Sequence, residues 1–162
     1  YSFDKYALNW TPEATEQFGA RDWNFCGLSS TGQYQSAIDL SGDIFISTNF
    51  GEDWTYRYNI GPSNINAINI THDGQHQTAS NGSSIFVSND YGNTWSKALD
   101  TQGTIVYVSI SLNGQYQKVV ISGDSLYSSN DYGVSWTRLD DDSPLYYSIQ
   151  AFPTNFLYGF SI

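Results

Sequence analysis

Apolar and polar residues alternate in short segments along most of this chain, and turns rich in Gly, Asn, Asp and Ser separate the segments. Alternation with a period of two places successive side chains on opposite faces of a strand. The helical period is absent, apart from a short stretch near Pro12 to Phe18. The pattern therefore predicts an all-β protein built from short, half-buried strands.

The predicted strands group into three units of four. They lie at about 23–29, 33–40, 43–48 and 53–58 in the first unit, at about 65–71, 75–80, 84–89 and 94–99 in the second, and at about 104–111, 115–121, 125–130 and 135–139 in the third. Asp73-Gly74 and Asn113-Gly114 mark turns between first and second strands, because such turns need a positive φ. Antiparallel four-stranded units that recur about every 40 residues are typical of propeller blades.

Each unit also contains one copy of an eight-residue motif, and the tryptophans of successive copies lie 41 residues apart. The matching residues are Ser47, Asn49, Gly51 and Trp54, then Ser88, Asp90, Gly92 and Trp95, then Ser129, Asp131, Gly133 and Trp136. The glycine allows a tight turn, the Asp accepts hydrogen bonds within it, and the tryptophan packs into the sheet. Because Asn49 replaces Asp, and Asp53 stands where Ser or Thr is expected, we expect the first turn to be weaker.

These segments resemble the Asp-box, or BNR, repeat with the pattern S-x-D-x-G-x-[ST]-W, in three copies across most of the chain. The resemblance implies a β-propeller, a fold of sialidases, some other glycosidases, lectins, sortilin-type receptors and photosystem assembly factors. In that family the box is structural and lies away from the ligand face. The resemblance therefore concerns the fold and leaves the activity open.

A single propeller domain of about four blades is expected over residues 1–162. The expected blades are approximately 23–58, 64–99 and 104–139, with a composite fourth blade from 145–162 plus 1–11. Tyr147 to Phe152 and Phe156 to Ile162 are the predicted first and second strands of that blade, and Trp10 aligns with the box tryptophans. Pairing of the two ends would close a ring and remove exposed edges. Two alternatives stay open, namely a longer propeller, and a ring or polymer of several chains.

Composition and net charge disfavour some classes of binding partner. The net charge is −10 and only six Lys and Arg residues occur, which disfavours general binding to nucleic acid or anionic membranes. No segment approaches the roughly 20 apolar residues that span a bilayer, so no membrane insertion is expected. Cys26 is the only cysteine, which rules out an internal disulfide and a cysteine metal cluster. We expect Cys26 to be buried as a small hydrophobic residue.

Sialidase chemistry is disfavoured. It needs three arginines around the substrate carboxylate, together with a Tyr nucleophile, its Glu partner and an acidic proton donor. The chain has only Arg21, Arg57 and Arg138, and the last two are predicted on outer fourth strands. The Arg-Ile-Pro sequence typical of such enzymes is missing.

A glycosidase with two carboxylates is harder to exclude, because Asp is abundant. The candidates are Asp39, Asp43, Asp124 and the run Asp140 to Asp142. Asp43 and Asp124 follow a glycine in predicted turns, where Asp is common. Turn chemistry therefore accounts for these residues without catalysis.

Two histidines raise the question of a metal. His72 and His76 flank a hairpin turn beside Asp73, but no further ligand follows at a familiar spacing. His76 also replaces Tyr34 and Tyr116 of the other units, which favours a structural role. We predict neither a metal site nor a cofactor.

The predicted ligand face is formed by loops between blades and by turns between second and third strands. These segments lie at about 11–22, 59–64, 99–103 and 140–145, and at about 41–43, 81–83 and 122–124. Most are short and polar, which suits shallow contacts with carbohydrate or protein better than a deep catalytic pocket. Asp43, Asp124 and Asp141 are the candidate ligand-binding residues.

The favoured hypothesis is a non-catalytic binding module for carbohydrate or glycoprotein at an extracellular or virion surface. The alternative is a structural subunit of a larger assembly, such as a virion or an extracellular fibre, which would include a homo-oligomer. A glycoside hydrolase or sialidase ranks third. Sequons at Asn9, Asn69 and Asn81 add only a weak indication of secretion.

Overall fold

The computed structural model of the protein describes residues 18–63, 67–122, 125–139, 149–151 and 157–159. These residues form fourteen β-strands, which confirms the all-β prediction. The strands are β1 (Trp23–Leu28), β2 (Gln35–Asp39), β3 (Asp43–Ser47), β4 (Thr55–Asn59), β5 (Ala67–Ile70), β6 (Gln77–Ser80), β7 (Ser84–Ser88), β8 (Ser96–Asp100), β9 (Thr104–Ile110), β10 (Gln117–Ser122), β11 (Leu126–Ser129), β12 (Thr137–Leu139), β13 (Ile149–Ala151) and β14 (Leu157–Gly159).

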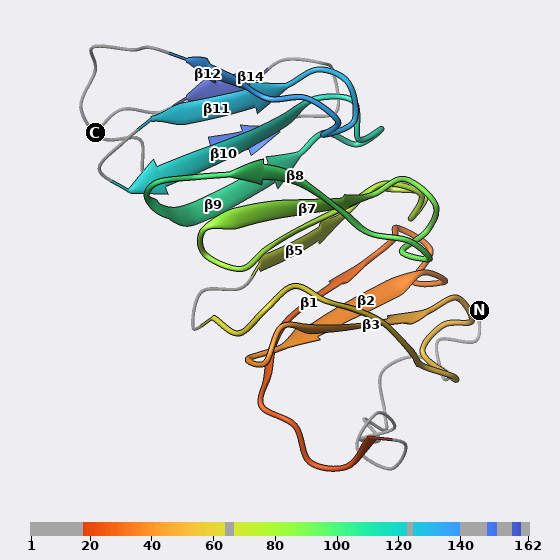
Figure 1. Cartoon of the computed structure of the whole chain (residues 1–162). Helices are drawn as coiled ribbons and strands as arrows, with labels where there is room; N and C mark the ends of the chain where they lie inside the picture. Colours follow the sequence, from red (N-terminus) through yellow and green to blue (C-terminus); the bar gives the residue numbers. More distant parts are fainter. Residues whose placement is uncertain (1–17, 64–66, 123–124, 140–148, 152–156, 160–162) are drawn as a thin grey trace.

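Consecutive strands form three four-stranded antiparallel sheets, β1–β4, β5–β8 and β9–β12, which we call blades 1, 2 and 3 (Figure 1). Strands β13 and β14 also pair antiparallel as a two-stranded sheet, which we call the half blade. The first strands of successive blades contact one another in the order β1, β5, β9 and β13. Blade 1 and the half blade therefore lie at opposite ends of the row. The predicted completion of the fourth blade by residues 1–11 lies outside the described residues.

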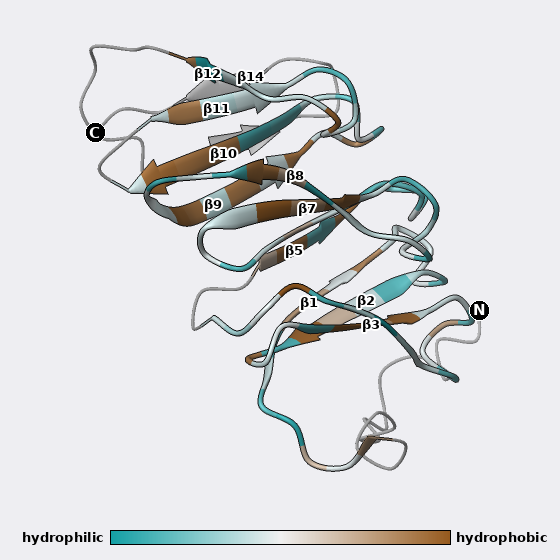
Figure 2. Cartoon of the chain, viewed as in Figure 1, coloured by the Kyte–Doolittle hydropathy of each residue, from teal (hydrophilic) through white to brown (hydrophobic). Residues whose placement is uncertain are grey.

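Apolar side chains fill the contact between neighbouring blades, which we call a seam. Alternate residues of a strand face opposite sides of its sheet, so a blade offers one apolar row to each neighbour. The rows are Ile38, Ile44, Ile46, Ile60, Ile68, Ala79, Phe86 and Trp95 in the seam of blades 1 and 2, and Ile85, Val87, Ile105, Val108, Val119 and Ile121 in the seam of blades 2 and 3. Burial of each large side chain contributes roughly 1.5–3 kcal/mol. The turns are mainly hydrophilic (Figure 2).

One hydrogen bond recurs in both of these seams. Ser36 Oγ donates to Gln77 Oε1 at 2.6 Å, and Thr78 Oγ1 donates to Gln117 Oε1 at 2.7 Å. Both glutamines are buried, and each Nε2 donates to a glycine carbonyl in its own hairpin turn. Each amide therefore joins a turn of its own blade to a strand of the preceding blade, in a place that excludes water.

The second motif copy forms a closed turn between β7 and β8. Ser88 Oγ donates to Asp90 Oδ1 at 2.8 Å and accepts from the Gly92 amide at 2.9 Å. The Asp90 carboxylate accepts from the Thr94 amide at 2.8 Å and from the Thr94 hydroxyl at 2.6 Å, and Trp95 Nε1 donates to the Gly92 carbonyl. Burial opposes ionisation of Asp90, but the hydrogen bonds from Thr94 and Ser88 outweigh it, so its pKa lies below the usual value.

The third copy repeats this turn. The participating residues are Ser129, Asp131, Gly133, Ser135 and Trp136. Hydrogen bonds from the hydroxyl and amide of Ser135 hold the pKa of Asp131 below its usual value.

The first copy forms the same turn, but the donor and the acceptor of one side-chain hydrogen bond are exchanged. Asn49 Oδ1 accepts from Ser47 Oγ and from the Asp53 amide, both at 3.0 Å. Asn49 Nδ2 then donates to Asp53 Oδ2 at 2.9 Å, whereas in the second copy the hydroxyl at the position of Asp53 is the donor. We expected a weaker turn here, but the bonds that Ser88, Asp90 and Thr94 make in the second copy all have counterparts, because the two substitutions compensate each other. The bond from Asn93 Nδ2 to the Asp90 carbonyl has none, since Glu52 stands at that position.

The residue before the box glycine takes a left-handed backbone in all three turns. Its φ is 65° at Phe50, 63° at Tyr91 and 64° at Tyr132, a conformation that bulky side chains rarely adopt. Two of these rings contact the preceding blade. Tyr91 lies tilted against Tyr34 at 4.6 Å, and Tyr132 stacks on His76 at 4.5 Å, both between ring centroids. In these two turns, the residue with the strained backbone is therefore also the one that contacts the preceding blade.

Cys26 is exposed, so the prediction that it is buried is wrong. On β1 the residue that faces blade 2 is its neighbour Gly27, where an added Cβ would lie 3.1 Å from Ile70 Cγ2. Because successive side chains alternate, Cys26 points to the opposite side, which no blade of the described residues covers.

The reversed first turn generates a double-substitution test. We expect Asp90→Ala to lower the free energy of unfolding by about 2–3 kcal/mol, because several hydrogen bonds of the turn are lost. The double variant Asp90→Asn/Thr94→Asp copies the Asn49 and Asp53 pair and is expected to stay within about 0.5 kcal/mol of the parent protein. Urea unfolding measures both. A double variant as unstable as Asp90→Ala would contradict the equivalence of the two turns.

The hydrogen bond from Ser36 to Gln77 can be tested against a second buried serine as a control. Ser36→Ala is expected to lower the free energy of unfolding by about 1–3 kcal/mol, since it leaves Gln77 Oε1 buried and unpaired. Ser80 is equally buried, but its Oγ has no hydrogen-bond partner in the described structure. Ser80→Ala is therefore expected to be neutral or stabilising in the same urea experiment. Equal losses for the two variants would argue against the seam bond.

Candidate functional site

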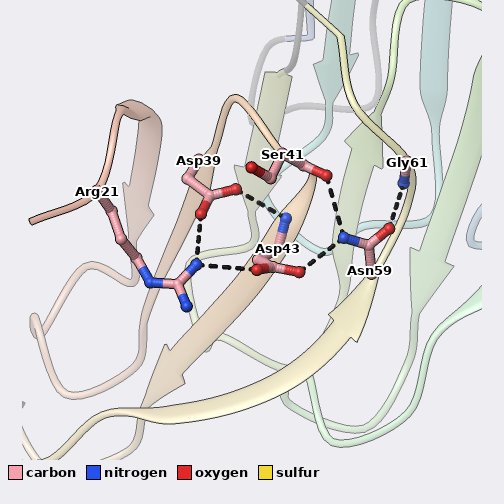
Figure 3. Close-up of polar contacts among 6 residues, drawn as sticks. All are labelled: Arg21, Asp39, Ser41, Asp43, Asn59 and Gly61. Atoms are coloured by element: carbon pink, nitrogen blue, oxygen red, sulfur yellow. Dashed lines mark hydrogen bonds and ion pairs between the residues drawn. The ribbon is translucent and has the colours of Figure 1, made fainter. Parts of the chain in front are cut away.

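Four polar side chains meet around the turn between β2 and β3 of blade 1 (Figure 3). Arg21 comes from the segment before β1, Asp39 ends β2, Asp43 begins β3 and Asn59 ends β4. We call these residues the Arg21 cluster. It lies where the sequence places the predicted ligand face, because that face collects the turns between second and third strands.

The Arg21 guanidinium bridges two carboxylates. Its Nη1 lies 2.6 Å from Asp39 Oδ2 and 2.8 Å from Asp43 Oδ2. The Asp39 side chain is only 3% exposed, whereas Asp43 and Arg21 are 21% and 28% exposed. Hydrogen bonds to Asp39 and then to Asp43 raise the pKa of Arg21, so the guanidinium stays charged. With Asn59 neutral, the cluster carries a net charge of −1.

The guanidinium of Arg21 lies over an aromatic ring. Arg21 Cζ lies 4.6 Å from the ring centroid of Phe45, in a cation–π arrangement. Phe45 is buried and also contacts the rings of Phe18, Trp23 and Tyr56, at centroid distances of 4.6, 5.3 and 5.6 Å. The charged group is therefore held against a packed apolar surface.

Asn59 connects the carboxylates to the backbone. Its Nδ2 donates to Asp43 Oδ1 at 2.6 Å and to the Ser41 carbonyl at 3.0 Å, and its Oδ1 accepts from the Gly61 amide at 2.9 Å. Asp39 Oδ1 in turn accepts from the Asp43 amide at 3.0 Å. The side chains of the cluster are thus fixed by bonds among themselves and to the turn.

A close backbone contact sets the shape of the turn. Gly42 has a φ of 83°, and a Cβ at this position would lie 2.1 Å from the carbonyl oxygen of Gly61. The Ile60 amide donates to the Gly42 carbonyl at 2.9 Å. Only glycine permits both the conformation and the approach.

The corresponding positions of blades 2 and 3 carry different chemistry. Ser84 replaces Asp43 and donates to Asp100 Oδ1 at 2.5 Å, while Lys97 Nζ lies 2.9 Å from Asp100 Oδ2. The bond from Ser84, followed by that from Lys97, holds the pKa of Asp100 below its usual value. Blade 1 is therefore the place in the described chain where one cation bridges two carboxylates.

Of the three predicted ligand-binding residues, the structure describes only one. Asp43 belongs to the Arg21 cluster, whereas Asp124 and Asp141 lie outside the described residues. Arg57 lies on β4 and Arg138 on β12, as expected for outer strands. The three arginines do not converge, since Arg21 binds its two carboxylates and Arg138 Nε donates to Ser125 Oγ at 2.6 Å.

Arg21 and Asn59 were not predicted as members of a site. Arg21 lies 18 and 22 residues before its two partners, and it belongs to no copy of the repeat. A usable signal was the departure of Asp43 from the repeat, because serines stand at positions 84 and 125 of the other blades.

Both histidines take part in seams. His72 Nε2 lies 3.1 Å from Ser30 Oγ of blade 1, and His76 Nδ1 lies 2.7 Å from Asn89 Oδ1. His76 also stacks on Tyr132 of blade 3. Within the described residues, no group of three or more His, Cys, Asp or Glu side chains is placed to hold a metal ion. The described part of the chain also has no helix of the length and apolarity that crossing a bilayer requires.

No protein-family model and no curated protein sequence matches this chain. Among solved structures, the chain is similar to a GH74 enzyme from Niastella koreensis, with a TM-score of 0.64 and 18% identity over 82% of this chain and 20% of the enzyme. It is also similar to YCF48 bound to D1 peptide, with a TM-score of 0.61 and 14% identity over 76% of this chain and 41% of YCF48. YCF48 from Cyanidioschyzon merolae gives a TM-score of 0.57 at 19% identity, over 74% of this chain and 37% of that chain.

These similarities confirm the predicted β-propeller fold. The chain matches less than half the length of each of these structures. At these identities the likeness concerns the fold alone, since propellers carry many activities.

The Arg21 cluster generates a stability prediction. Arg21→Gln leaves Asp39 buried without its cation, and we expect a loss of about 2–4 kcal/mol at neutral pH, because breaking a buried pair strands a charge.

Urea unfolding at neutral pH measures this effect. Arg57→Gln is the control, since Arg57 is exposed on β4, and it is expected to change stability by less than about 0.5 kcal/mol. Arg21→Gln/Asp39→Asn should recover much of the loss, because it also removes the stranded charge. A double variant as unstable as Arg21→Gln would show that packing on Phe45, rather than charge, is what matters.

Proposed function

We propose that the chain is a non-catalytic binding module of the Asp-box type that recognises carbohydrate or glycoprotein through the Arg21 cluster. The observation that carries the proposal is the arrangement of Arg21, Asp43 and Asn59. These side chains offer partly exposed donors and acceptors in positions fixed by their mutual bonds. A preorganised polar site loses little entropy when a ligand binds.

The chemistry of the cluster suits a sugar. Carboxylate, amide and guanidinium groups pair with the hydroxyls of a sugar as acceptors and donors. Tyr56 is 48% exposed and, like Arg21, contacts Phe45, so its ring lies on the same side of blade 1. An exposed ring beside polar groups provides a stacking surface for the apolar face of a sugar ring.

The geometry disfavours hydrolysis. A glycosidase needs one carboxyl group that is protonated and ready to donate to the leaving group. Asp39 and Asp43 both bind a single guanidinium nitrogen, so both carboxyl groups are already engaged within the cluster. The similarity to GH74 enzymes concerns the fold and supplies no acid for this site.

The Asp-box assignment rests on the three turns. Each combines a serine hydroxyl, an Asn or Asp acceptor, a left-handed residue before glycine, and a tryptophan that bonds the glycine carbonyl. The turns lie at the opposite ends of the strands from the β2–β3 turn, which supports a structural role for the boxes and a binding role for the Arg21 side.

A protein ligand is the second candidate. YCF48, whose fold is similar, has been solved with a bound D1 peptide. The net charge of −10 would favour a basic protein surface over nucleic acid. A structural role in a larger assembly stays the alternative to ligand binding.

The proposed extracellular or virion location does not rest on the sequons. Asn69 Nδ2 donates to the Val108 carbonyl at 3.0 Å, and Asn81 Nδ2 donates to the Ile60 carbonyl at 2.5 Å. Both amides therefore bond neighbouring blades, where a bulky glycan would disturb the seam. Asn9 lies outside the described residues.

Binding to a glycan array, followed by titration calorimetry with the best sugar, tests the proposal. We expect Tyr56→Ser to weaken binding by roughly 2- to 12-fold, the value of one aromatic contact. Asn59→Ala should weaken it further, because it removes a donor and frees Asp43. Val134→Ser is the control, since this exposed residue lies in a box turn at the opposite end of the blades.

The other outcomes discriminate the alternatives. Binding to peptides without any binding to glycans would replace the sugar by a protein ligand. Turnover of a glycan that disappears in Asp43→Asn would make the chain a hydrolase and overturn the proposal.

A further inference from the structure

The sequence contains two Asn-Gly pairs, and both lie in turns. Asn81-Gly82 connects β6 to β7, and Asn113-Gly114 connects β9 to β10. In such a pair the backbone nitrogen of the glycine can attack the side-chain carbon Cγ of the asparagine, because no Cβ on the glycine hinders the approach. This reaction, deamidation, needs no enzyme. The surroundings of the two pairs differ in the folded chain.

Deamidation exchanges ammonia for water without any change in oxidation state. The glycine amide loses its proton and its nitrogen forms a bond to Cγ. The bond from Cγ to Nδ2 then breaks, and Nδ2 takes up the proton and leaves as ammonia, so that a cyclic imide remains. Water opens the imide at Cγ to give aspartate, or at the backbone carbonyl to give isoaspartate, whose main chain is longer by one carbon.

The surroundings of Asn81 favour this attack. Asn81 Oδ1 accepts from the Ser84 amide at 2.9 Å and from the Ser83 amide at 3.3 Å. Negative charge develops on this oxygen as the nitrogen attacks, and donors that are already in place stabilise it. The Gly82 amide has no hydrogen-bond partner among the described residues. Its proton can therefore leave without the loss of a hydrogen bond.

Asn113 has similar donors, but its attacking nitrogen is held. Asn113 Oδ1 accepts from Ser111 Oγ at 2.9 Å and from the Gln115 amide at 3.2 Å. The Gly114 amide donates to the Ser111 carbonyl at 2.9 Å. The attack on Asn113 must first break this bond, which raises its barrier relative to that at Asn81.

Asn81 also joins blade 2 to blade 1. Its Nδ2 donates to the Ile60 carbonyl at 2.5 Å. The Ile60 amide donates in turn to the Gly42 carbonyl at 2.9 Å, and the Gly61 amide donates to Asn59 Oδ1 at 2.9 Å (Figure 3). The segment that follows β4 is thus held between Asn81 on one side and the β2–β3 turn on the other.

We propose that Asn81 is a deamidation site, and that its conversion weakens the seam of blades 1 and 2. Aspartate has an oxygen in the place of the Nδ2 donor, so the Ile60 carbonyl loses its partner and faces a second oxygen, which repels it. Isoaspartate lengthens the turn between β6 and β7 as well. The proposal concerns the seam, and it holds whether or not the Arg21 cluster binds a sugar.

The same change at Asn113 leaves its hydrogen bonds intact. Blade 2 has Asp73 at the corresponding place, where Oδ1 accepts from Thr71 Oγ1 at 2.6 Å and from the Gln75 amide at 3.0 Å. These two bonds match those of Asn113, and no described residue accepts a hydrogen bond from Asn113 Nδ2. The variant Asn113→Asp is therefore the matched control for Asn81→Asp.

Peptide mapping of the parent protein after incubation in mildly alkaline buffer measures both reactions. In the folded protein we expect Asn81 to deamidate roughly 2- to 12-fold faster than Asn113, the factor that one hydrogen bond supplies. In concentrated urea the two rates should become equal, because the difference comes from the fold. Equal rates in the folded protein, a faster reaction at Asn113, or a difference that persists in urea would overturn the assignment of the site.

Melting temperatures of the two variants test the effect on the seam. Asn81→Asp is expected to melt at least about 2–4 °C below the parent protein, the shift that one lost hydrogen bond causes in a chain of this size. Asn113→Asp should melt with the parent. Hydrogen exchange then locates the change, since the Ile60 and Gly61 amides should exchange faster in Asn81→Asp and the His72 amide, which bonds blade 3, should not. A folded Asn81→Asp variant with the melting temperature and the exchange rates of the parent would refute the effect on the seam.

Discussion

The fold depends on the fact that each blade is apolar on both faces. A four-stranded sheet of this kind gains its stability only when a neighbour covers each face, so the seam is the unit of the structure rather than the blade. The buried pairs of Ser36 with Gln77 and Thr78 with Gln117 add direction to this contact, since a glutamine accepts only from the blade before it. Apolar burial supplies the energy, and the amides fix how one blade is placed on the next.

The strands and turns could be predicted because their causes are local. Alternation marks the strands, and glycine, Asp and tryptophan at fixed spacing mark the box turns. The first box shows the limit of this reasoning. Asn49 and Asp53 each depart from the pattern, and each change taken alone weakens the turn. Together they restore the bond with donor and acceptor exchanged. Only the pair, considered in three dimensions, explains the observed turn.

The candidate site could be predicted only in part. Asp43 was found because it follows a glycine in a turn, but its cation is 22 residues away in a segment without repeat character. No local sequence pattern predicts that Arg21 also binds Asp39 and lies over Phe45. The prediction that Cys26 is buried was wrong for a similar reason. Its apolar neighbours suggest burial, whereas the direction of its side chain depends on how β1 packs against blade 2.

The recurring hydroxyl and glutamine pair has a consequence for how such a chain can change over evolutionary time. Because each seam uses the same two positions, one whole unit can be duplicated or deleted while every remaining junction keeps its donor and its acceptor. A break within a unit would instead leave a glutamine without its hydroxyl. Gene rearrangements that span complete units are therefore tolerated most readily, and the lineage of this protein is expected to vary in length by steps of about 41 residues.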